Sequence, residues 1–411
     1  MPTLKFQKQT IYQALGREPV HPFPARMAPG IALHAMMGHS HQLRVLDPMV
    51  GSGTVLAMAR ARGHRGFGFD LDPLAVLISR VWTTANDPEQ VRDATAEVLT
   101  NARDLLPDIS EDDAYPLDAD DETRNFVNYW FDSQTRRQLT ALSACIDCAS
   151  QNITRDVLWC AYSRLIITKQ AGASLARDLA HSRPHRYYSE APLKPFEKFT
   201  ASVARVLANS LSVNTADRGP AATIHLGDAR KLPLQSESID LVLTSPPYLN
   251  AIDYLRCSKF SLVWMGENVS SLRKVRADSV GAEAARDSPA DDSEVVRVLQ
   301  ALKLKPKLSP KNERILARYI DDMRGSIAEV GRVLVNNGKA VYVVGENTVR
   351  GTYIRNASVV SQLAALAGLT LIERRTRTLP ANRRYMPPPA AAASSMDARM
   401  RREVVMTFTK K

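Results

Sequence analysis

Hydrophobic and polar positions alternate along the chain in two different ways, and this change divides it into blocks. Residues 1–84 and 221–411 carry short apolar runs of strand length, separated by stretches with helical spacing. Residues 85–220 carry helical spacing almost throughout, with few strand signals. The first pattern predicts a doubly wound α/β sheet, and the second predicts a large, mainly helical insertion into it.

The pattern also gives the approximate limits of each element. Strands are expected at 43–46, 66–70, 224–228, 239–243, 339–345, 370–375 and 401–408. Helices are expected at 55–62, from 73 onward, 90–106, 133–150, 154–167, 196–211, 318–334 and 358–367. Residues 269–314 are polar and lack a clear period except near 293–303. A segment of this length is expected to be a mobile loop within the sheet block.

A glycine-rich loop joins the first expected strand to the first helix. It reads Asp47-Pro48-Met49-Val50-Gly51-Ser52-Gly53-Thr54. Its glycines allow tight turning and close approach of the backbone to a ligand. The spacing is not that of a pyrophosphate binder, and no lysine follows the glycines as in a P-loop. Asp70, at the end of the second strand, is placed to bind ribose hydroxyls, whereas Asp72 is expected to cap the helix that starts at Pro73.

A second motif, Thr244-Ser-Pro-Pro-Tyr248, follows the apolar run 239–243. Two successive prolines cannot continue a strand ladder, so the chain must leave the sheet at the carboxyl end of a strand. Open α/β sheets bind ligands at that edge. Ser245 offers a hydroxyl, Pro246 a carbonyl free of the ladder, and Tyr248 an aromatic face. A planar ring with an exocyclic amine suits such a site.

The two motifs together resemble those of S-adenosylmethionine (SAM)-dependent amino-methyltransferases that act on DNA, with Met49 where the family's loop usually has Phe. His21 to Met27, a strand ending in Gly227-Asp228-Ala229, and the last strand also resemble family segments, in the family's non-permuted order. The resemblance implies a Rossmann-like class I methyltransferase sheet with SAM as cofactor and no metal. It assigns catalysis to Ser245, Pro246, Pro247 and Tyr248. It assigns the cofactor to Phe23, Asp47, Pro48, Gly51, Ser52, Gly53, Thr54, Asp70, Asp228 and Ser245.

Methyl transfer to an exocyclic base amine is the activity that this resemblance implies. Ser at position 245 favours N4 of cytosine, and N6 of adenine is the alternative. An RNA amino-methyltransferase would use the same core. A protein-glutamine methyltransferase usually has Asn at the position of Ser245, which argues against that class. An inactive nucleic-acid-binding module is the non-enzyme alternative, and the intact glycine loop and Tyr248 argue against it.

Charge indicates a nucleic-acid partner. The formal net charge is +11, which favours a polyanion. Residues 181–188 mix basic and aromatic side chains, and residues 374–402 contain eight arginines against one acid. The predicted nucleic-acid contacts are Arg183, Arg186, Tyr187, Tyr188, Arg383 and Arg384. Target recognition is expected from 85–220, from 269–314 or from a partner restriction or recognition subunit.

Two compositional features complete the prediction. The sequence has no apolar run of 18 residues and no signal peptide, so a cytoplasmic protein without membrane contact is expected. Cys145 and Cys148 form a single C-x-x-C pair without a second pair or a nearby histidine, which is incomplete for zinc. They are expected to be small buried side chains.

Overall fold

The structure is a computed structural model. It describes residues 9–23, 26–180, 184–214, 219–249, 254–282, 292–379 and 402–411. The strands are β1 (Arg44–Asp47), β2 (Arg65–Asp70), β3 (Ala85–Asn86), β4 (Leu211–Ser212), β5 (Thr223–Leu226), β6 (Ile239–Thr244), β7 (Leu334–Gly345), β8 (Asn347–Val349), β9 (Thr352–Ile354), β10 (Leu369–Thr378) and β11 (Arg402–Lys410).

The helices on and around the sheet are α2 (Ile11–Leu15), α3 (Pro29–Ala35), α4 (Thr54–Ala61), α5 (Pro73–Thr83), α13 (Ser293–Ala301), α14 (Pro310–Val333) and α15 (Asn356–Leu366). The remaining helices are α6 (Pro88–Leu105), α7 (Asp121–Trp130), α8 (Ser133–Asp147), α9 (Ile153–Ile166), α10 (Pro195–Leu207), α11 (Leu255–Leu262) and α12 (Val269–Asp278).

Seven strands form the central sheet in the order β10-β11-β7-β6-β1-β2-β5. The five from β7 to β5 are parallel, and β11 runs antiparallel to both β7 and β10. From β1 the chain continues to β2 on one side, whereas β6 lies on the other side. This reversal is a topological switch point, and ligands bind beside it at the carboxyl ends of the strands. The predicted doubly wound α/β class with a helical insertion is confirmed.

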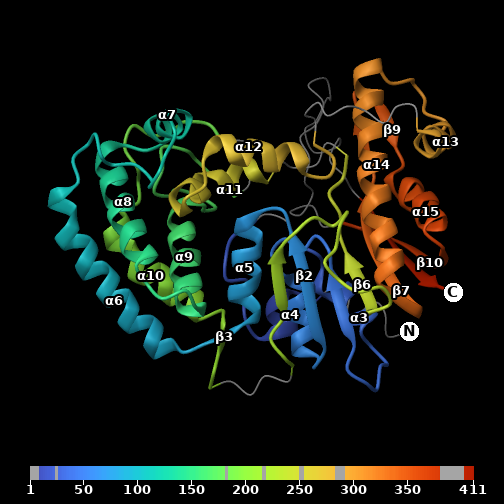
Figure 1. The fold of residues 1–411 in the computed structure, drawn as a ribbon, viewed down its shortest axis with the longest axis horizontal. Helices are drawn as coiled ribbons and strands as arrows, with labels where there is room; N and C mark the ends of the chain where they lie inside the picture. The colour runs from blue at the N-terminus through green and yellow to red at the C-terminus, as the bar shows by residue number, and fades with distance from the viewer. Residues whose placement is uncertain are drawn as a thin grey trace.

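Alternating side chains of the strands build a separate core on each face of the sheet. Val45, Leu241 and Val343 pack on one face with α3 and α4. Leu46 and Val242 point to the opposite face, where α13, α14 and α15 cover the sheet. This two-residue period is the one expected of strands buried on both faces. Figure 1 shows α14 and α15 beside the sheet, on the side away from α6 to α10.

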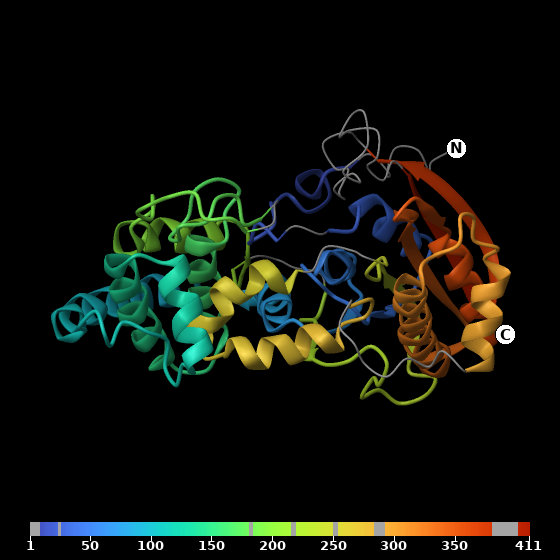
Figure 2. The same ribbon diagram turned by 90° about the horizontal axis from the view of Figure 1, so that it is seen from above.

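The helical part of the molecule shares its core with the sheet block. Helices α6 to α10 pack together at one end of the molecule (Figures 1 and 2). Their core also contains Trp82 of α5 and Phe260 of α11, both buried. The predicted boundary, with 85–220 on one side and all of 221–411 on the other, therefore needs correction. Helices α11 and α12 join the helical core although they follow the catalytic motif in sequence.

The prediction of a loop over 269–314 is wrong for most of that segment. It contains α12, α13 and the first turn of α14. On α12 only Leu272 is buried, and its apolar stripe is short, formed by Val269, Leu272 and Val275 in an otherwise polar segment. Residues 283–291 lie outside the described residues.

Two smaller points complete the description. Cys145 is half-buried and Cys148 is exposed, so the prediction that both are buried is wrong for Cys148, which caps the carboxyl end of α8. Within the described ranges, no helix combines the length and apolar character needed to cross a membrane.

Candidate active site

The glycine loop between β1 and α4 is packed closely against α5. Gly53 has a φ of 81°, and a Cβ atom there would lie 3.0 Å from the Cα atom of Ser79. The Ser79 hydroxyl donates to the Gly51 carbonyl at 2.8 Å. Gly51 has a φ of 50° and its missing Cβ would lie 3.9 Å from the Phe23 ring. A side chain at Gly53 would push the loop away from α5, whereas Gly51 leaves its backbone open towards the cavity.

Asp70 links the end of β2 to this loop. Its Oδ2 atom accepts the Gly51 N–H at 2.8 Å, and its Oδ1 atom accepts the Asp72 N–H at 3.0 Å. A carboxylate has about four acceptor positions, so each oxygen keeps one for a ligand hydroxyl. Burial raises the pKa of Asp70 above its ordinary value. Asp70 is thus oriented by backbone donors at the switch point of the sheet.

Two further carboxyl groups lie in the same region. Burial raises the pKa of Asp47 to about 8. Burial, followed by the charge of Asp70, raises the pKa of Asp72 to about 7. Asp72 caps α5 by accepting the Leu74 N–H at 2.9 Å, as expected from the sequence, and it also accepts the Ser258 hydroxyl at 2.7 Å. Three crowded carboxyl groups would lower their cost of ionisation by binding a positively charged ligand.

The Ser-Pro-Pro-Tyr turn leaves the sheet directly after β6 and is held by neighbouring strands. The Ser245 hydroxyl donates to the Val343 carbonyl of β7 at 3.2 Å. The side-chain amide of Asn347 donates to the Leu249 carbonyl. Because the single proton of Ser245 Oγ is engaged by Val343, its lone pairs are available to accept a hydrogen bond.

The hydroxyl of Tyr248 reaches the last strand of the chain. It donates to Glu403 Oε1 of β11 at 3.3 Å. Glu403 also accepts from Arg377 of β10, at 2.8 Å from Nε and 2.7 Å from Nη2. Burial, and then the nearby Glu403 carboxylate, raise the pKa of Tyr248 well above its ordinary value. The tyrosine therefore stays protonated and acts as a donor.

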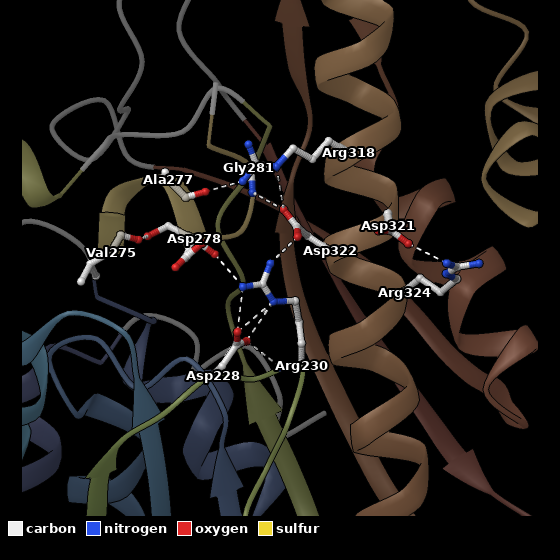
Figure 3. Close-up of polar contacts among 11 residues, drawn as sticks. Asp228, Arg230, Val275, Ala277, Asp278, Gly281, Arg318, Asp321, Asp322 and Arg324 are labelled. Carbon is white, nitrogen blue, oxygen red and sulfur yellow. Dashed lines mark hydrogen bonds and ion pairs between the residues drawn. The ribbon is translucent and has the colours of Figure 1, made fainter. Parts of the chain in front are cut away.

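Asp228 follows β5 and takes part in a network of charges, which Figure 3 shows. Its two oxygens accept from the Arg230 guanidinium at 2.7–3.0 Å. Arg230 also forms an ion pair with Asp322 of α14 and donates to the Asp278 carbonyl at 2.7 Å. The Asp228 carboxylate is thus held in one orientation, and most of its acceptor positions are occupied.

The same network fastens the end of α12 to α14. The Arg318 guanidinium donates to the Ala277 carbonyl, and Asp322 accepts the Gly281 N–H at 3.4 Å (Figure 3). Arg318 and Asp322 both have side chains less than one-tenth exposed. Helix α12 belongs to the helical core and α14 to the sheet core. The network therefore bridges the two parts of the molecule beside Asp228.

Most of the predicted site residues line one cavity of about 750 Å³. Its lining includes Phe23, Asp47, Pro48, Gly51, Ser52, Thr54, Asp70, Asp228, Ser245, Pro246, Pro247 and Tyr248. Gly53 does not line the cavity, since it faces α5. The two motifs lie about 190 residues apart in the sequence, and the α/β fold brings them to one edge of the sheet.

The cavity also contains residues that the sequence did not suggest. They come from distant parts of the chain and include Lys169, Tyr254, Arg256, Arg276, Arg377 and Glu403. Tyr254 packs against Phe23, with ring centroids 5.5 Å apart. Lys169 follows α9, so the helical part contributes directly to the cavity. These residues have no motif spacing that could mark them in a single sequence.

The predicted nucleic-acid contacts lie apart from this cavity where the structure describes them. Arg186 stacks on Tyr129 with 5.4 Å between its guanidinium carbon and the ring centroid, and Arg177 lies 5.0 Å from the Tyr187 centroid. Tyr187 is 60% exposed and packs edge-on against Tyr188. None of these side chains lines the cavity. Arg183, Arg383 and Arg384 lie outside the described residues.

No metal site accompanies the cavity in the described part of the chain. No group of three or more His, Cys, Asp or Glu side chains with metal-binding geometry occurs there. The strand order and the glycine loop at its switch point define a Rossmann-like α/β fold of the class I methyltransferase type.

Comparison with known proteins gives relatives among type II methyltransferases. The chain is 24% identical over 375 residues to the type II methyltransferase M.MvaI of Kocuria varians, a match covering 84% of this chain and 80% of the relative. It is 21% identical over 147 residues to the type II methyltransferase M.MjaII of Methanocaldococcus jannaschii, covering 36% of this chain and 27% of the relative. No family model matches the chain.

Among solved structures, a TehB-like SAM-dependent methyltransferase from Corynebacterium glutamicum aligns with a TM-score of 0.29 at 10% identity. The alignment covers 92% of this chain and 87% of that one.

Proposed function

We propose that this chain is a SAM-dependent DNA methyltransferase that methylates an exocyclic amine of a base, with N4 of cytosine as the favoured target. The observation that carries this proposal is the shared cavity. The glycine loop with Asp70 and the Ser-Pro-Pro-Tyr turn face one space of about 750 Å³, which suits a cofactor and a base together. The 24% identity to M.MvaI over most of both chains supports the same class.

The residues present fit the cofactor. The exposed backbone at Gly51 allows close approach of a ligand, and Asp70 keeps free acceptor positions for ribose hydroxyls. Asp47 and Asp72 favour a ligand with positive charge. Asp228 remains the candidate for the adenine amine, in an orientation set by Arg230. When bound, SAM supplies a methyl group on a sulfonium, which needs no further activation.

The catalytic turn supplies positioning for the target amine. That nitrogen is a poor nucleophile because its lone pair is delocalised into the base. Ser245 Oγ and the Pro246 carbonyl are both acceptors, since Ser245 already donates its proton to Val343. Accepting the two amine protons there favours a tetrahedral nitrogen and directs its lone pair towards the methyl group. The Tyr248 ring stacks on the base, and a base from duplex DNA must be flipped to reach it.

Three cations that line the cavity are the candidates for phosphate contacts. They are Lys169 in the loop after α9, Arg256 of α11 and Arg276 of α12. Phosphate contacts of this kind hold a nucleic acid without reading its sequence. We assign target binding to the helical part together with α11 and α12. A contribution from Arg186, Tyr187 and Tyr188 would then lie further along the bound strand.

One experiment tests the activity and identifies the base. The purified protein is incubated with SAM carrying a labelled methyl group and with genomic DNA or total RNA, and the nucleosides are analysed by mass spectrometry. Labelled N4-methylcytosine in DNA is the expected product. N6-methyladenine would correct the target base, and label in RNA alone would correct the substrate class. No label in any nucleoside, with SAM bound, would favour an inactive binding module.

The experiment also bears on a partner subunit. If the chain methylates DNA at a defined sequence by itself, it needs no separate recognition subunit. Tyr248→Ala serves as the inactive control protein, because it removes the stacking face of the turn without touching the glycine loop.

A further inference from the structure

The last strand, β11, brings a largely buried ion pair to the catalytic turn. Glu403, near the start of β11, lies opposite Arg377 of β10 in the antiparallel register. The side chains are only 13% and 18% exposed, and both line the cavity. On the other side of β11, Glu403 pairs with Gly345 at the end of β7. The pair therefore lies level with the carboxyl ends of the parallel strands, where Tyr248 emerges.

Placing this ion pair between two strands costs free energy. Removing two charges from water is costly, and good geometry with further hydrogen bonds is needed to offset that cost. Arg377 satisfies one oxygen of Glu403 through two of its nitrogens. The other oxygen accepts the Tyr248 hydroxyl at 3.3 Å. The strand pairing itself needs neither charge, so the partner that explains the arrangement is the tyrosine.

The hydrogen bond adds a restraint at the hydroxyl end of the ring. The backbone around Tyr248 is held by Ser245 on one side and by Asn347, through Leu249, on the other. The side chain packs partly against the core of the sheet. Glu403 holds its hydroxyl and thereby the direction of the long axis of the ring.

We propose that Glu403, held in place by Arg377, is a positioning residue that holds the ring of Tyr248 where it can stack on the target base. This inference rests on the proposed function. It extends the reacting centre to the last strand of the chain, beyond the Ser-Pro-Pro-Tyr turn. Glu403 acts through the tyrosine and does not touch the methyl group.

The hydrogen bond between Tyr248 and Glu403 sets the size of the expected change in the rate of methyl transfer. Loss of a hydrogen bond to a charged group slows a step that depends on it by about ten- to a hundredfold. Tyr248→Phe removes the donor of this contact, and Glu403→Gln removes the charge of its acceptor and the ion pair with Arg377, so both should slow single-turnover methyl transfer, Tyr248→Phe within that range. SAM affinity, measured by calorimetry, should be unchanged in both. The double variant should be no slower than the slower single variant, because the two changes remove one interaction.

A matched control lies on the same hairpin. Glu373 pairs with Arg375 on β10, away from the cavity, and each side chain is 39% exposed. Glu373→Gln removes an ion pair of the same kind and should keep the wild-type rate. A merely structural role for Glu403 would lower the melting temperature and leave the rate per folded molecule unchanged, whereas a positioning role lowers that rate and raises the fluorescence of a flipped 2-aminopurine at the target position, because stacking on Tyr248 quenches it.

The outcomes separate the inference from the function on which it rests. An inactive wild-type protein would overturn the proposed function. An active wild-type protein with a Glu403→Gln variant as fast as Glu373→Gln would overturn the positioning role alone. Losses that multiply in the double variant would also overturn it. If Glu403→Gln does not fold, Tyr248→Phe keeps the test, because full single-turnover activity in that variant contradicts the inference.

Discussion

The ionisation of Asp47 provides the sharpest test of the cofactor end of the cavity. Asp47 is 4% exposed, and burial raises its pKa to about 8. A positively charged cofactor binds the ionised form of such a carboxyl group. The ionised fraction rises from roughly 1% at pH 6 to about half at pH 8, so SAM affinity should rise about fiftyfold over this range. Asp47→Asn has no such titration and should show a flatter profile.

In the ligand-free protein, the same rise in pH lowers the stability of the fold. The folded pKa of Asp47 lies above its unfolded value of 3.8, so its contribution to stability is present below pH 4 and lost as the pH rises through 8. A shift of about four units corresponds to an upper limit on the order of 5 kcal/mol. The melting temperature without SAM should therefore fall as the pH rises from 5 to 8.5. Added SAM should raise the melting temperature most at high pH.

The assay is isothermal titration calorimetry with SAM between pH 6 and 8.5 in buffers of different ionisation enthalpy. The titration of SAM itself is common to all the proteins and cancels in the comparison. Asp93→Asn, an exposed change on α6, is the matched control and should follow the wild type. Equal pH dependence in Asp47→Asn and wild type would refute the reasoning.

Four further predictions concern other parts of the site. Tyr248→Ala should reduce methyl transfer by more than Tyr248→Phe and leave SAM affinity nearly unchanged in calorimetry; equal loss of SAM binding would move the turn away from the base. Asp70→Ala should weaken SAM binding by about 1–3 kcal/mol through lost ribose contacts, and unaltered affinity would assign the ribose elsewhere. Lys169→Met should lower the slope of log affinity against log salt for DNA by about one, whereas the same change at exposed Lys198 should not; identical slopes would remove Lys169 from the phosphate contacts. Arg230→Met should lower the free energy of unfolding by about 3 kcal/mol, since it leaves Asp322 buried without its closest cation, and a denaturant titration matching the wild type would contradict this.

The sequence contained the part of the site that depends on local chemistry. The loop needs glycine at position 53 because a Cβ atom there would lie 3.0 Å from the Cα atom of Ser79 in α5, and the proline pair marks the point where β6 ends. Both constraints are local and can be read from a few neighbouring residues. The alternation of apolar residues likewise gave the strands, because each alternate side chain enters a different core.

The rest of the site depends on contacts between distant segments. Glu403 and Lys169 reach the cavity only through the pairing of β11 and the packing of α9, which no local pattern records. Helix α12 was missed because its apolar stripe, Val269, Leu272 and Val275, is short and lies in an otherwise polar segment. Arg186 and Tyr187, predicted to contact nucleic acid, belong to a surface cation–π cluster. Composition alone cannot distinguish such a cluster from a ligand contact.

The shared core of α5 and the helical part has a consequence for protein engineering. Exchange of residues 85–220 between related enzymes, as a cassette meant to change the target sequence, would leave Trp82 and Phe260 facing a foreign surface. A chimera that also carries α5, α11 and α12 from the same donor would keep these packing partners together. The smallest portable unit for redesigning specificity is therefore discontinuous in the gene, and its junctions fall on both sides of the catalytic turn.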